Sequence, residues 1–537
     1  MDEEFYTRYS HGSSDLGGIE HACSLAQGLG PVAMLGGEII RFQPQHPNIV
    51  IGGAGSGKFA VLGAYQLVHP SMQSFFILDV GGQYMNVTWH YNLAMDREVY
   101  AINPQGVGAY PDINHPVHLW GILKVDTRLF DNARTIAGLS LTESDMQGEN
   151  AWVGQDARRW ITRFLTSIVL LEGRVTPLRL IDFIHTIDTD DEYLKYWGMG
   201  CADLPNDEYS TFVEINRKKH GSVKEYGAIM GKIKSDLDWL SSRSIAASIS
   251  GDIDYLAYLA DPNKKVGVYY VVESGTTREM ESLNRLVVGI GQLHCARSNK
   301  GALPVFYLEE AASCGKAEFI KKAVSQDRKH YTTVLIYQSG GQLILLFGKA
   351  GAQEILESCG TQIYLGGGIR EIDGAKRLAD SIGKKTIQID NRMAQADRAH
   401  RAGQASWEAM WNGRDMLDAE LAFVHEVMQS GQQSQTGRYL IDPAELMRLK
   451  NHVLVLSPGE GLPSLLADKL PNYWQNPAMI GRYGPDPLHS PLDRVAVPGR
   501  WFKRHLPFLR RAVPEHLADW PNHINGEIAY VDGYRTW

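Results

Sequence analysis

Residues 48–59 read NIVIGGAGSGKF, and this stretch decides the fold class. The β-rich run NIVI leads into the pattern G-x-x-x-x-G-K, and residues 59–68 then have a helical composition. In such a strand–loop–helix context the glycines let backbone N–H groups point at phosphate oxygens, and the helix N-terminus adds positive potential. The stretch therefore predicts a nucleotide-binding loop, with a plain glycine turn as the alternative.

The pattern predicts that eight residues contact a nucleotide. Lys58 is one of them and is expected to reach the β- and γ-phosphates. The pattern normally continues with Ser or Thr, whose hydroxyl holds Mg²⁺, but here it continues with Phe59, which has no hydroxyl. Nucleotide binding is therefore better supported by the sequence than hydrolysis. The predicted nucleotide-binding residues are Gly52, Gly53, Ala54, Gly55, Ser56, Gly57, Lys58 and Phe59.

The rest of the chain alternates strands with helices, which predicts an α/β fold built on a parallel sheet. Helical periodicity over 126–262 predicts an all-α domain inserted between the first part of the sheet domain, 47–125, and its second part, 263–456. The further strands are expected at 74–78, 98–102, 266–272, 304–308, 333–337, 362–365 and 386–389.

Three segments lie outside this pattern. Residues 1–46 are treated as an N-terminal segment, and the polar, Gln/Ala-rich stretch 392–436 is interpreted as a helical excursion. Eleven of the 23 prolines fall in residues 457–537, so long regular elements are not expected there. This part is predicted to be an extended tail packed over other surfaces.

Composition limits the class of protein. The chain has 537 residues with 44% hydrophobic and 21% charged residues, which excludes a disordered or collagen-like protein. The net charge of −8 argues neither for nor against DNA, because a local patch can bind nucleic acid. The five cysteines lie far apart, as expected of reduced thiols in the cytosol. The sequence contains no uninterrupted run of about 18 apolar residues, so no membrane span is predicted. The polar N-terminus does not resemble a signal peptide.

Acidic and amide side chains end two of the expected strands. Glu309 and Glu310 follow the strand 304–308, where one acid holds the water of a metal ion and the other polarises the attacking water. The alternative is that both begin a solvated helix, and Asp79 competes for the acidic role. Gln338 follows the next strand, either to sense a γ-phosphate or to make an ordinary hydrogen bond.

Taken together, these motifs resemble the coupling-protein ATPases of type IV secretion and conjugation, the TraG/TraD-like family. The loop matches the first nucleotide motif of the family, and the resemblance extends over most of the chain. The other similar segments are 77–91, 99–106, 149–171, 305–315, 327–343, 357–368 and 438–459.

The resemblance implies a RecA-like P-loop ATPase domain that uses ATP and Mg²⁺ and assembles as a homo-hexamer. It also implies a cytoplasmic protein, peripheral to the inner membrane, that brings relaxase-bound DNA or effector proteins to the type IV secretion machinery. By this resemblance Lys58 binds phosphate, Glu310 polarises water, Glu309 takes the metal-side position of an Asp, Gln338 is the sensor, and Arg328 acts on the nucleotide of a neighbouring subunit.

Departures from the family leave other interpretations open. The family's N-terminal membrane helices are absent from this sequence, so we expect a partner protein or a peripheral contact to attach the chain to the membrane. Phe59 and Glu309 favour a receptor that docks substrates without hydrolysing nucleotide, whereas Lys58, Glu310 and Gln338 favour an ATPase. A DNA pump of the FtsK/HerA kind shares the ATPase core but not the closing segment 438–459.

A basic stretch stands out near the C-terminal end of this acidic chain. Residues 480–515 carry seven Lys or Arg against three Asp or Glu, and RWFKRHLPFLRR interleaves these charges with aromatic rings. Such a composition suits single-stranded DNA or an anionic lipid surface. The alternative is a basic segment packed on the protein's own acidic surface.

Overall fold

The computed structural model describes residues 14–69, 74–95, 97–141, 151–204, 207–276, 279–298, 301–389, 434–489, 491–512 and 527–532, together with scattered positions between 400 and 424. Within these ranges, every helix is too short or too polar to cross a lipid bilayer.

The described residues form an eleven-stranded sheet in the order β2-β1-β13-β12-β9-β3-β8-β7-β4-β6-β5. The strands from β9 through β3 to β5 run parallel, as predicted, whereas β12, β13, β1 and β2 extend the sheet with antiparallel pairings. The strands are β1 (Pro31–Leu35), β2 (Glu38–Arg41), β3 (Asn48–Ile51), β4 (Phe75–Val80), β5 (Glu98–Ile102), β6 (Val266–Val272), β7 (Val305–Leu308), β8 (Thr332–Tyr337), β9 (Thr361–Leu365), β12 (His452–Ser457) and β13 (Leu462–Lys469).

The parallel strands form because their sequences are continuous apolar runs. Every residue of β3, β6, β7 and β8 is buried, which is the pattern of strands covered by helices on both faces. The helices around the sheet are α2 (Ile19–Ser24), η1 (Lys58–Gly63), α3 (Ala64–Leu67), α4 (Gln83–Ala94), α12 (Glu281–Arg297), α13 (Glu318–Ser325), α14 (Gly340–Ser358), α15 (Ile372–Ile382) and α18 (Pro443–Arg448). Two separate apolar clusters on the two faces follow from this layering.

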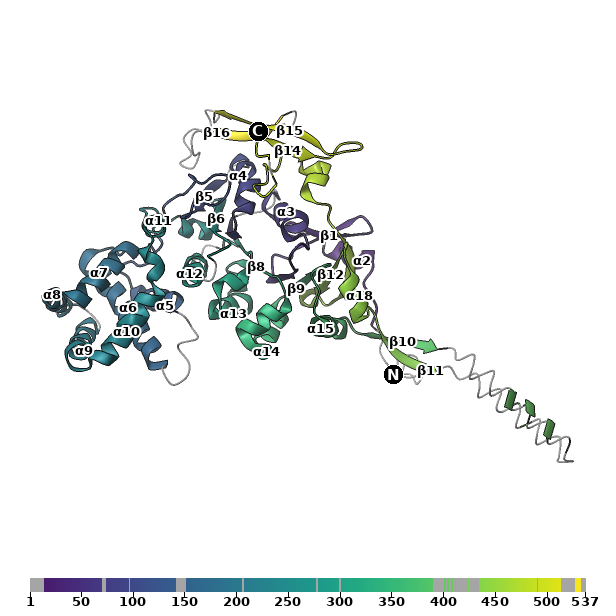
Figure 1. Ribbon diagram of the computed structural model, residues 1–537, viewed down its shortest axis with the longest axis horizontal. Coiled ribbons are helices and arrows are strands. Elements are labelled where there is room, and N and C mark those ends of the chain that lie inside the picture. Colours follow the sequence, from purple (N-terminus) through teal and green to yellow (C-terminus); the bar gives the residue numbers. More distant parts are fainter. Residues whose placement is uncertain are drawn as a thin grey trace.

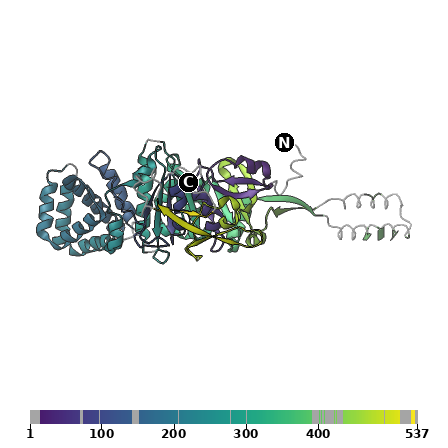
Figure 2. The same ribbon diagram turned by 90° about the horizontal axis from the view of Figure 1, so that it is seen from above.

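Between β5 and β6 the chain forms helices over the range for which periodicity predicts the insertion. Phe164 of one helix packs edge-on against Phe183 and Trp197 of its neighbours, at ring distances of 5.3 and 5.7 Å. Figures 1 and 2 show these helices gathered at one end of the molecule. They are α5 (Leu129–Ser140), α6 (Ala151–Glu172), α7 (Pro177–Thr189), α8 (Asp191–Cys201), α9 (Glu208–Gly221), α10 (Val223–Asp236), η3 (Asp238–Ser241), α11 (Arg243–Ser248) and η4 (Tyr255–Ala260).

The strand expected at 386–389 does not belong to the large sheet, contrary to the sequence-based expectation. It forms β10 (Lys384–Ile389), which pairs only with β11 (Ser434–Tyr439) in a two-stranded antiparallel ribbon. This ribbon projects from the end opposite the helical insertion (Figure 2). The helical excursion expected at 392–436 lies almost entirely outside the described residues.

Both terminal segments contribute strands, which the sequence analysis did not predict. The eight-residue β13 joins the large sheet, and β1 and β2 of the segment 1–46 pair beyond it. A separate three-stranded sheet contains β14 (Arg494–Val497), β15 (Arg504–Ala512) and β16 (Glu527–Val531). Strands form despite the many prolines because most of these prolines lie in the connections between strands, where no ladder hydrogen bond is lost.

Candidate functional site

The glycine loop begins at the carboxyl end of β3, in the middle of the large sheet. The N–H of Gly52 donates to the carbonyl of Tyr337 at 3.0 Å, which ties the start of the loop to β8. Gly55 and Gly57 have φ angles of 75° and 88°, in the left-handed region that favours glycine. The pattern of glycines is therefore required by the backbone of this turn.

Lys58 begins η1, the π-helical turn that continues into α3. Its Nζ donates to the carbonyl of Gly52 at 2.8 Å, so the side chain folds back over the loop. Burial lowers the pKa of Lys58, and the carboxylates of Glu309 and Glu310 oppose this shift. A lysine in these surroundings gains a stronger partner when a phosphate approaches, because charge-assisted hydrogen bonds exceed those to a neutral carbonyl.

Glu309 lies directly after β7, and the strand register places it beside Asp79, since Leu78 pairs with Leu308. Its Oε2 atom is buried and has no hydrogen-bond partner in the described structure. Burial raises the pKa of Glu309 well above its usual range, and Asp79 and Glu310 raise it further. An unpartnered carboxylate oxygen at this position fits a role toward a Mg²⁺ ion or its water.

Asp79 is fully buried at the end of β4. It accepts hydrogen bonds from the backbone N–H groups of Tyr84 at 3.2 Å and Met85 at 2.8 Å, and so holds the first turn of α4. Burial raises its pKa to about 7, against the pull of these backbone donors. Asp79 thus lies beside Glu309, while the oxygens of Asp79 accept hydrogen bonds from the backbone of α4.

Glu310 and Gln338 lie in contact, at the ends of the neighbouring strands β7 and β8. The Nε2 of Gln338 donates to the Oε1 of Glu310, and the backbone N–H of Gln338 donates to the Oε1 of Gln342 at 2.9 Å. Glu310 is the non-glycine residue with a positive φ among those described, at 52°. A left-handed backbone at a non-glycine residue stores strain, and such strain concentrates at functional sites.

Arg328 does not join these residues within one chain. It is exposed in η6 (Asp327–Lys329), before β8 begins, whereas Gln338 follows the end of that strand. Six residues of strand separate the two ends by about 20 Å. The structure therefore places Arg328 near the amino end of β8, whereas the glycine loop of the same chain follows the carboxyl end of the neighbouring strand β3.

Two cations beside the loop were missed in the sequence. Lys469, the last residue of β13, donates from Nζ to the carbonyls of Ser56 and Gly366, both at 2.8 Å. The Nη2 of Arg370 donates to the carbonyl of Ala54 at 3.0 Å. Lys469 lies 413 positions from Ser56 along the chain, so no local pattern pointed to either contact.

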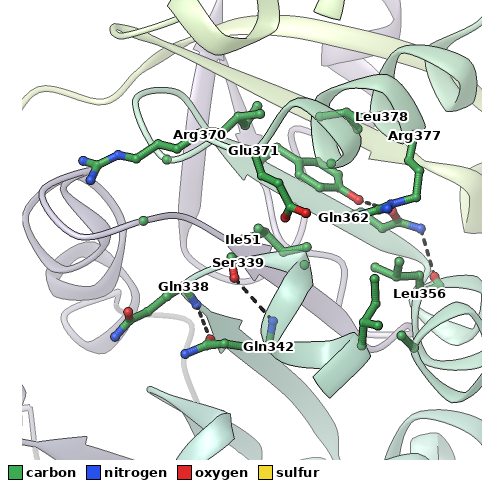
Figure 3. A pocket seen from close by; sticks show the side chains of 18 of the residues that line it. Ile51, Gln338, Ser339, Gln342, Leu356, Gln362, Arg370, Glu371, Arg377 and Leu378 are labelled. Atoms are coloured by element: carbon green, nitrogen blue, oxygen red, sulfur yellow. Dashed lines mark hydrogen bonds between the residues drawn. The ribbon is translucent and has the colours of Figure 1, made fainter. Parts of the chain in front are cut away.

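Two cavities flank the loop. The larger, about 850 Å³, lies between α14 and α15; Figure 3 shows Gln338, Ser339 and Gln342 on one side of it and Arg370 and Glu371 on the other. Its lining includes Gly53 and Ala54 of the loop, but not Lys58, Glu309 or Glu310. The smaller, about 590 Å³, is lined by Gly55–Gly57 of the loop and by basic residues, among them Arg370, Lys450 and Lys469.

Phe59 occupies a packed aromatic site in place of a hydroxyl. Its ring meets Tyr84 edge-on at 4.7 Å and Tyr473 at 5.6 Å, and it is 7% exposed. Within the described residues, no group of three or more His, Cys, Asp or Glu side chains is arranged to hold a metal ion.

Known proteins match most of this chain. A protein family described as "Type IV secretory system Conjugative DNA transfer" matches residues 20–412. The type IV secretion system-coupling protein VirD4 of Bartonella quintana is 23% identical over 213 residues, 39% of this chain and 32% of the relative. VirD4 of Bartonella henselae is 26% identical over 167 residues, 30% of this chain and 26% of the relative. The chain thus spans a third or less of the length of these curated relatives.

Solved structures match over a larger part of the chain. The bacterial conjugative coupling protein TrwB, in a form called TrwBdeltaN70 with sulphate, has a TM-score of 0.59 at 15% identity, with 85% of this chain and 93% of that chain covered. TrwB in complex with ADP and Mg²⁺ gives 0.58 at 14% identity, with coverage of 86% and 94%. These likenesses confirm the expected RecA-like P-loop α/β fold. Because the family match covers well over half of the residues, the chain belongs to the type IV secretory system conjugative DNA transfer family.

Proposed function

We propose that the protein is a coupling ATPase, which binds ATP and Mg²⁺ at residues 52–59 and recruits or moves DNA or protein substrates toward a type IV secretion machinery. The observation that carries this proposal is the convergence of Lys58, Glu309, Glu310 and Gln338 at one edge of the sheet. The family match and the coupling-protein names of VirD4 and TrwB support the proposal.

Phosphate binding is the first step. The backbone N–H groups of residues 53–58 and the start of η1 supply positive potential for the β- and γ-phosphates. Lys58 exchanges its bond to the Gly52 carbonyl for a phosphate oxygen. Lys469 and Arg370 hold three carbonyls of this region, and thereby keep the loop in the shape that turns N–H groups toward the ligand.

The acids prepare the water for attack on the γ-phosphate. Bound Mg²⁺ would neutralise phosphate charge, and Glu309 would hold it or one of its waters. Glu310 accepts a proton from the attacking water, because it is the carboxylate that faces the sensor amide. Gln338 holds the Oε1 of Glu310 until a γ-phosphate competes for its amide, which links nucleotide state to the position of the acid.

Assembly completes the site in this proposal. A homo-hexamer brings the exposed Arg328 of one subunit toward the nucleotide of the next, where a finger arginine contributes about 10³–10⁵ in rate. The ring would sit in the cytoplasm at the inner membrane, with a partner protein as its anchor, and would receive relaxase-bound DNA or effector proteins.

A second candidate function is a receptor that binds nucleotide without turnover. Phe59 favours it, because its buried ring fills the place of the Mg²⁺-binding hydroxyl. Glu309 also favours it, since this residue stands at the metal-side position where the family resemblance leads us to expect an Asp.

Equilibrium binding of a fluorescent ATP analogue, followed by single-turnover hydrolysis, tests the proposal. We expect binding by the wild-type chain and by Glu310→Gln, loss of binding in Lys58→Ala, and loss of the chemical step alone in Glu310→Gln. The exposed Lys124→Ala serves as the control and should behave as wild type. Binding without turnover in the wild type would favour the receptor, and unchanged binding in Lys58→Ala would contradict both.

A further inference from the structure

The connection between β14 and β15 carries two aromatic side chains into solvent. Trp501 is 80% exposed and Phe502 is 83% exposed, and Arg500, Lys503 and Arg504 flank them. We propose that this segment, residues 500–504, here called the hairpin tip, inserts into the headgroup region of an anionic lipid bilayer. The proposal concerns the exposed hairpin tip and not the nucleotide loop, and it does not depend on the proposed function.

The hairpin is held firmly behind its tip. Val495 and Val497 of β14 are buried, and the last antiparallel pair, Val497 with Arg504, closes the connection. The hydroxyl of Tyr483 donates to the carbonyl of Ala496 at 2.6 Å. The exposed rings are therefore presented from a fixed base, along the side of the molecule where Figure 1 shows β14, β15 and β16 as an outer layer.

Charge favours an anionic partner. The segment 491–512 contains six Lys or Arg residues against one Asp, within a chain whose net charge is −8. Arg494 pairs with Asp493, and Arg510 and Arg511 lie over the rings of Tyr110 and Tyr530. Of the three cations of the hairpin tip, Arg500 and Lys503 lie over the rings of Trp501 and Trp474, and none of the three has a carboxylate partner in the described part of the chain. An anionic surface would supply the missing negative charge.

The arrangement of apolar groups favours lipid over single-stranded DNA. Bases stack on rings spread along a face, but Phe508 on the face of β15 is turned inward against His90, at a ring distance of 5.6 Å. The two exposed rings are instead adjacent at a turn, as suits insertion at a bilayer interface where Trp is enriched.

Further exposed apolar residues lie beside the base of the hairpin. Lys503 lies 5.1 Å from the ring of Trp474, whose ring is 6.4 Å from His489. The segment around His489 includes Leu488, which is 67% exposed, and Leu492, which is 46% exposed. These leucines add exposed apolar surface near the base of the hairpin.

Co-sedimentation with vesicles tests the proposal, with vesicles of phosphatidylcholine alone and with about a third phosphatidylglycerol. We expect the full chain to bind only the anionic vesicles, and to bind them about fivefold more weakly for each tip cation neutralised, as in Lys503→Gln. Trp501→Ala with Phe502→Ala should weaken binding at least tenfold without changing the melting temperature, because neither ring is packed. Tyr196→Ala, at an aromatic residue 70% exposed in α8, is the matched control and should bind normally.

Two results would overturn the lipid assignment. One is equal sedimentation of the double variant and the wild type, or no sedimentation of the wild type with anionic vesicles. The other is binding of the wild type to an oligothymidylate, lost in the double variant, with no binding to vesicles. That outcome would assign the hairpin tip to nucleic acid.

Discussion

The acids below the nucleotide loop repel one another in a buried place. Asp79 and Glu309 lie side by side at the ends of β4 and β7. Burial raises the pKa of both, and Asp79 raises the pKa of Glu309 further. Lys58 partly offsets this repulsion. The site is thus arranged for added positive charge, which is what a metal–nucleotide complex brings.

Asp79→Asn should alter the pH dependence of stability. The pKa of Asp79 is raised from 3.8 to about 7 in the fold, so the folded state binds more protons and loses stability as pH rises between these values. Since Asn does not titrate, the unfolding free energy of the variant should rise relative to that of the wild type, by up to about 1.4 kcal/mol for each pH unit between pH 4 and 7. Urea unfolding at several pH values measures this; a pH-independent difference would show that Asp79 titrates normally.

Phe59→Thr should restore the missing hydroxyl at the expense of packing. Removing most of a buried ring that contacts Tyr84 and Tyr473 should cost about 3 kcal/mol of unfolding free energy. The matched control, Phe502→Thr, removes an exposed ring and should stay within about 0.5 kcal/mol of wild type. Denaturant melts compare the two variants, and equal stabilities would mean that Phe59 does not tie the loop helix to the segment around Tyr473.

At the scale of elements, β13 and the nucleotide loop act together. β13 pairs with β1 and β12, and its final residue, Lys469, reaches the carbonyls of Ser56 and Gly366. Burial lowers the pKa of Lys469, because a buried ammonium group loses its hydration. A strand from late in the chain therefore supports a loop near its beginning.

Lys469→Met should weaken nucleotide binding by about tenfold, since two hydrogen bonds that shape the loop contribute about 1–1.5 kcal/mol. The exposed Lys265→Met, at the start of β6 in the same sheet, controls for loss of a lysine and should bind normally. Titration with a fluorescent ATP analogue measures both. Unchanged affinity in Lys469→Met would show that the loop keeps its shape without β13.

How far the sequence predicts these elements depends on their burial. The central parallel strands were found because both faces are covered and their residues form continuous apolar runs. β1, β2 and β13 were missed because they are short or half-exposed strands, with mixed patterns such as that of Leu462–Lys469. β10 has the local pattern of a sheet strand, and only its pairing with β11 reveals a separate ribbon.

The same division holds for the candidate site. Residues 52–58, Glu309, Glu310 and Gln338 were predicted because each stands at a strand end in a known pattern, and the strand register then brings them together. Lys469 and Arg370 were not predicted, because their contacts join segments that lie far apart in the sequence. The roles assigned to all these residues remain predictions.

At the scale of the whole molecule, the proposed role of Arg328 would require a second subunit. Arg328 precedes β8, whereas the nucleotide loop follows the carboxyl end of the neighbouring strand β3, so the proposed homo-hexamer would have to bring the arginine of one subunit to the loop of the next.

Mixing two inactive variants tests this arrangement. Lys58→Ala and Arg328→Ala should each abolish turnover alone, but in mixed rings roughly a quarter of the sites should combine an intact lysine with an intact arginine from the neighbour. ATPase activity of the equimolar mixture, compared with each variant, measures this complementation. An Arg328→Ala variant with normal turnover would exclude the arginine from the reaction.

Steady-state hydrolysis of Mg²⁺-ATP by the purified protein, with and without single-stranded DNA and beside Lys58→Ala, is the most direct test of whether the glycine loop powers the protein. We predict turnover that DNA stimulates and that Lys58→Ala removes, while the variant keeps its fold by circular dichroism. Turnover that persists in Lys58→Ala, or a complete lack of turnover in the wild type under all these conditions, would contradict a motor built on this site.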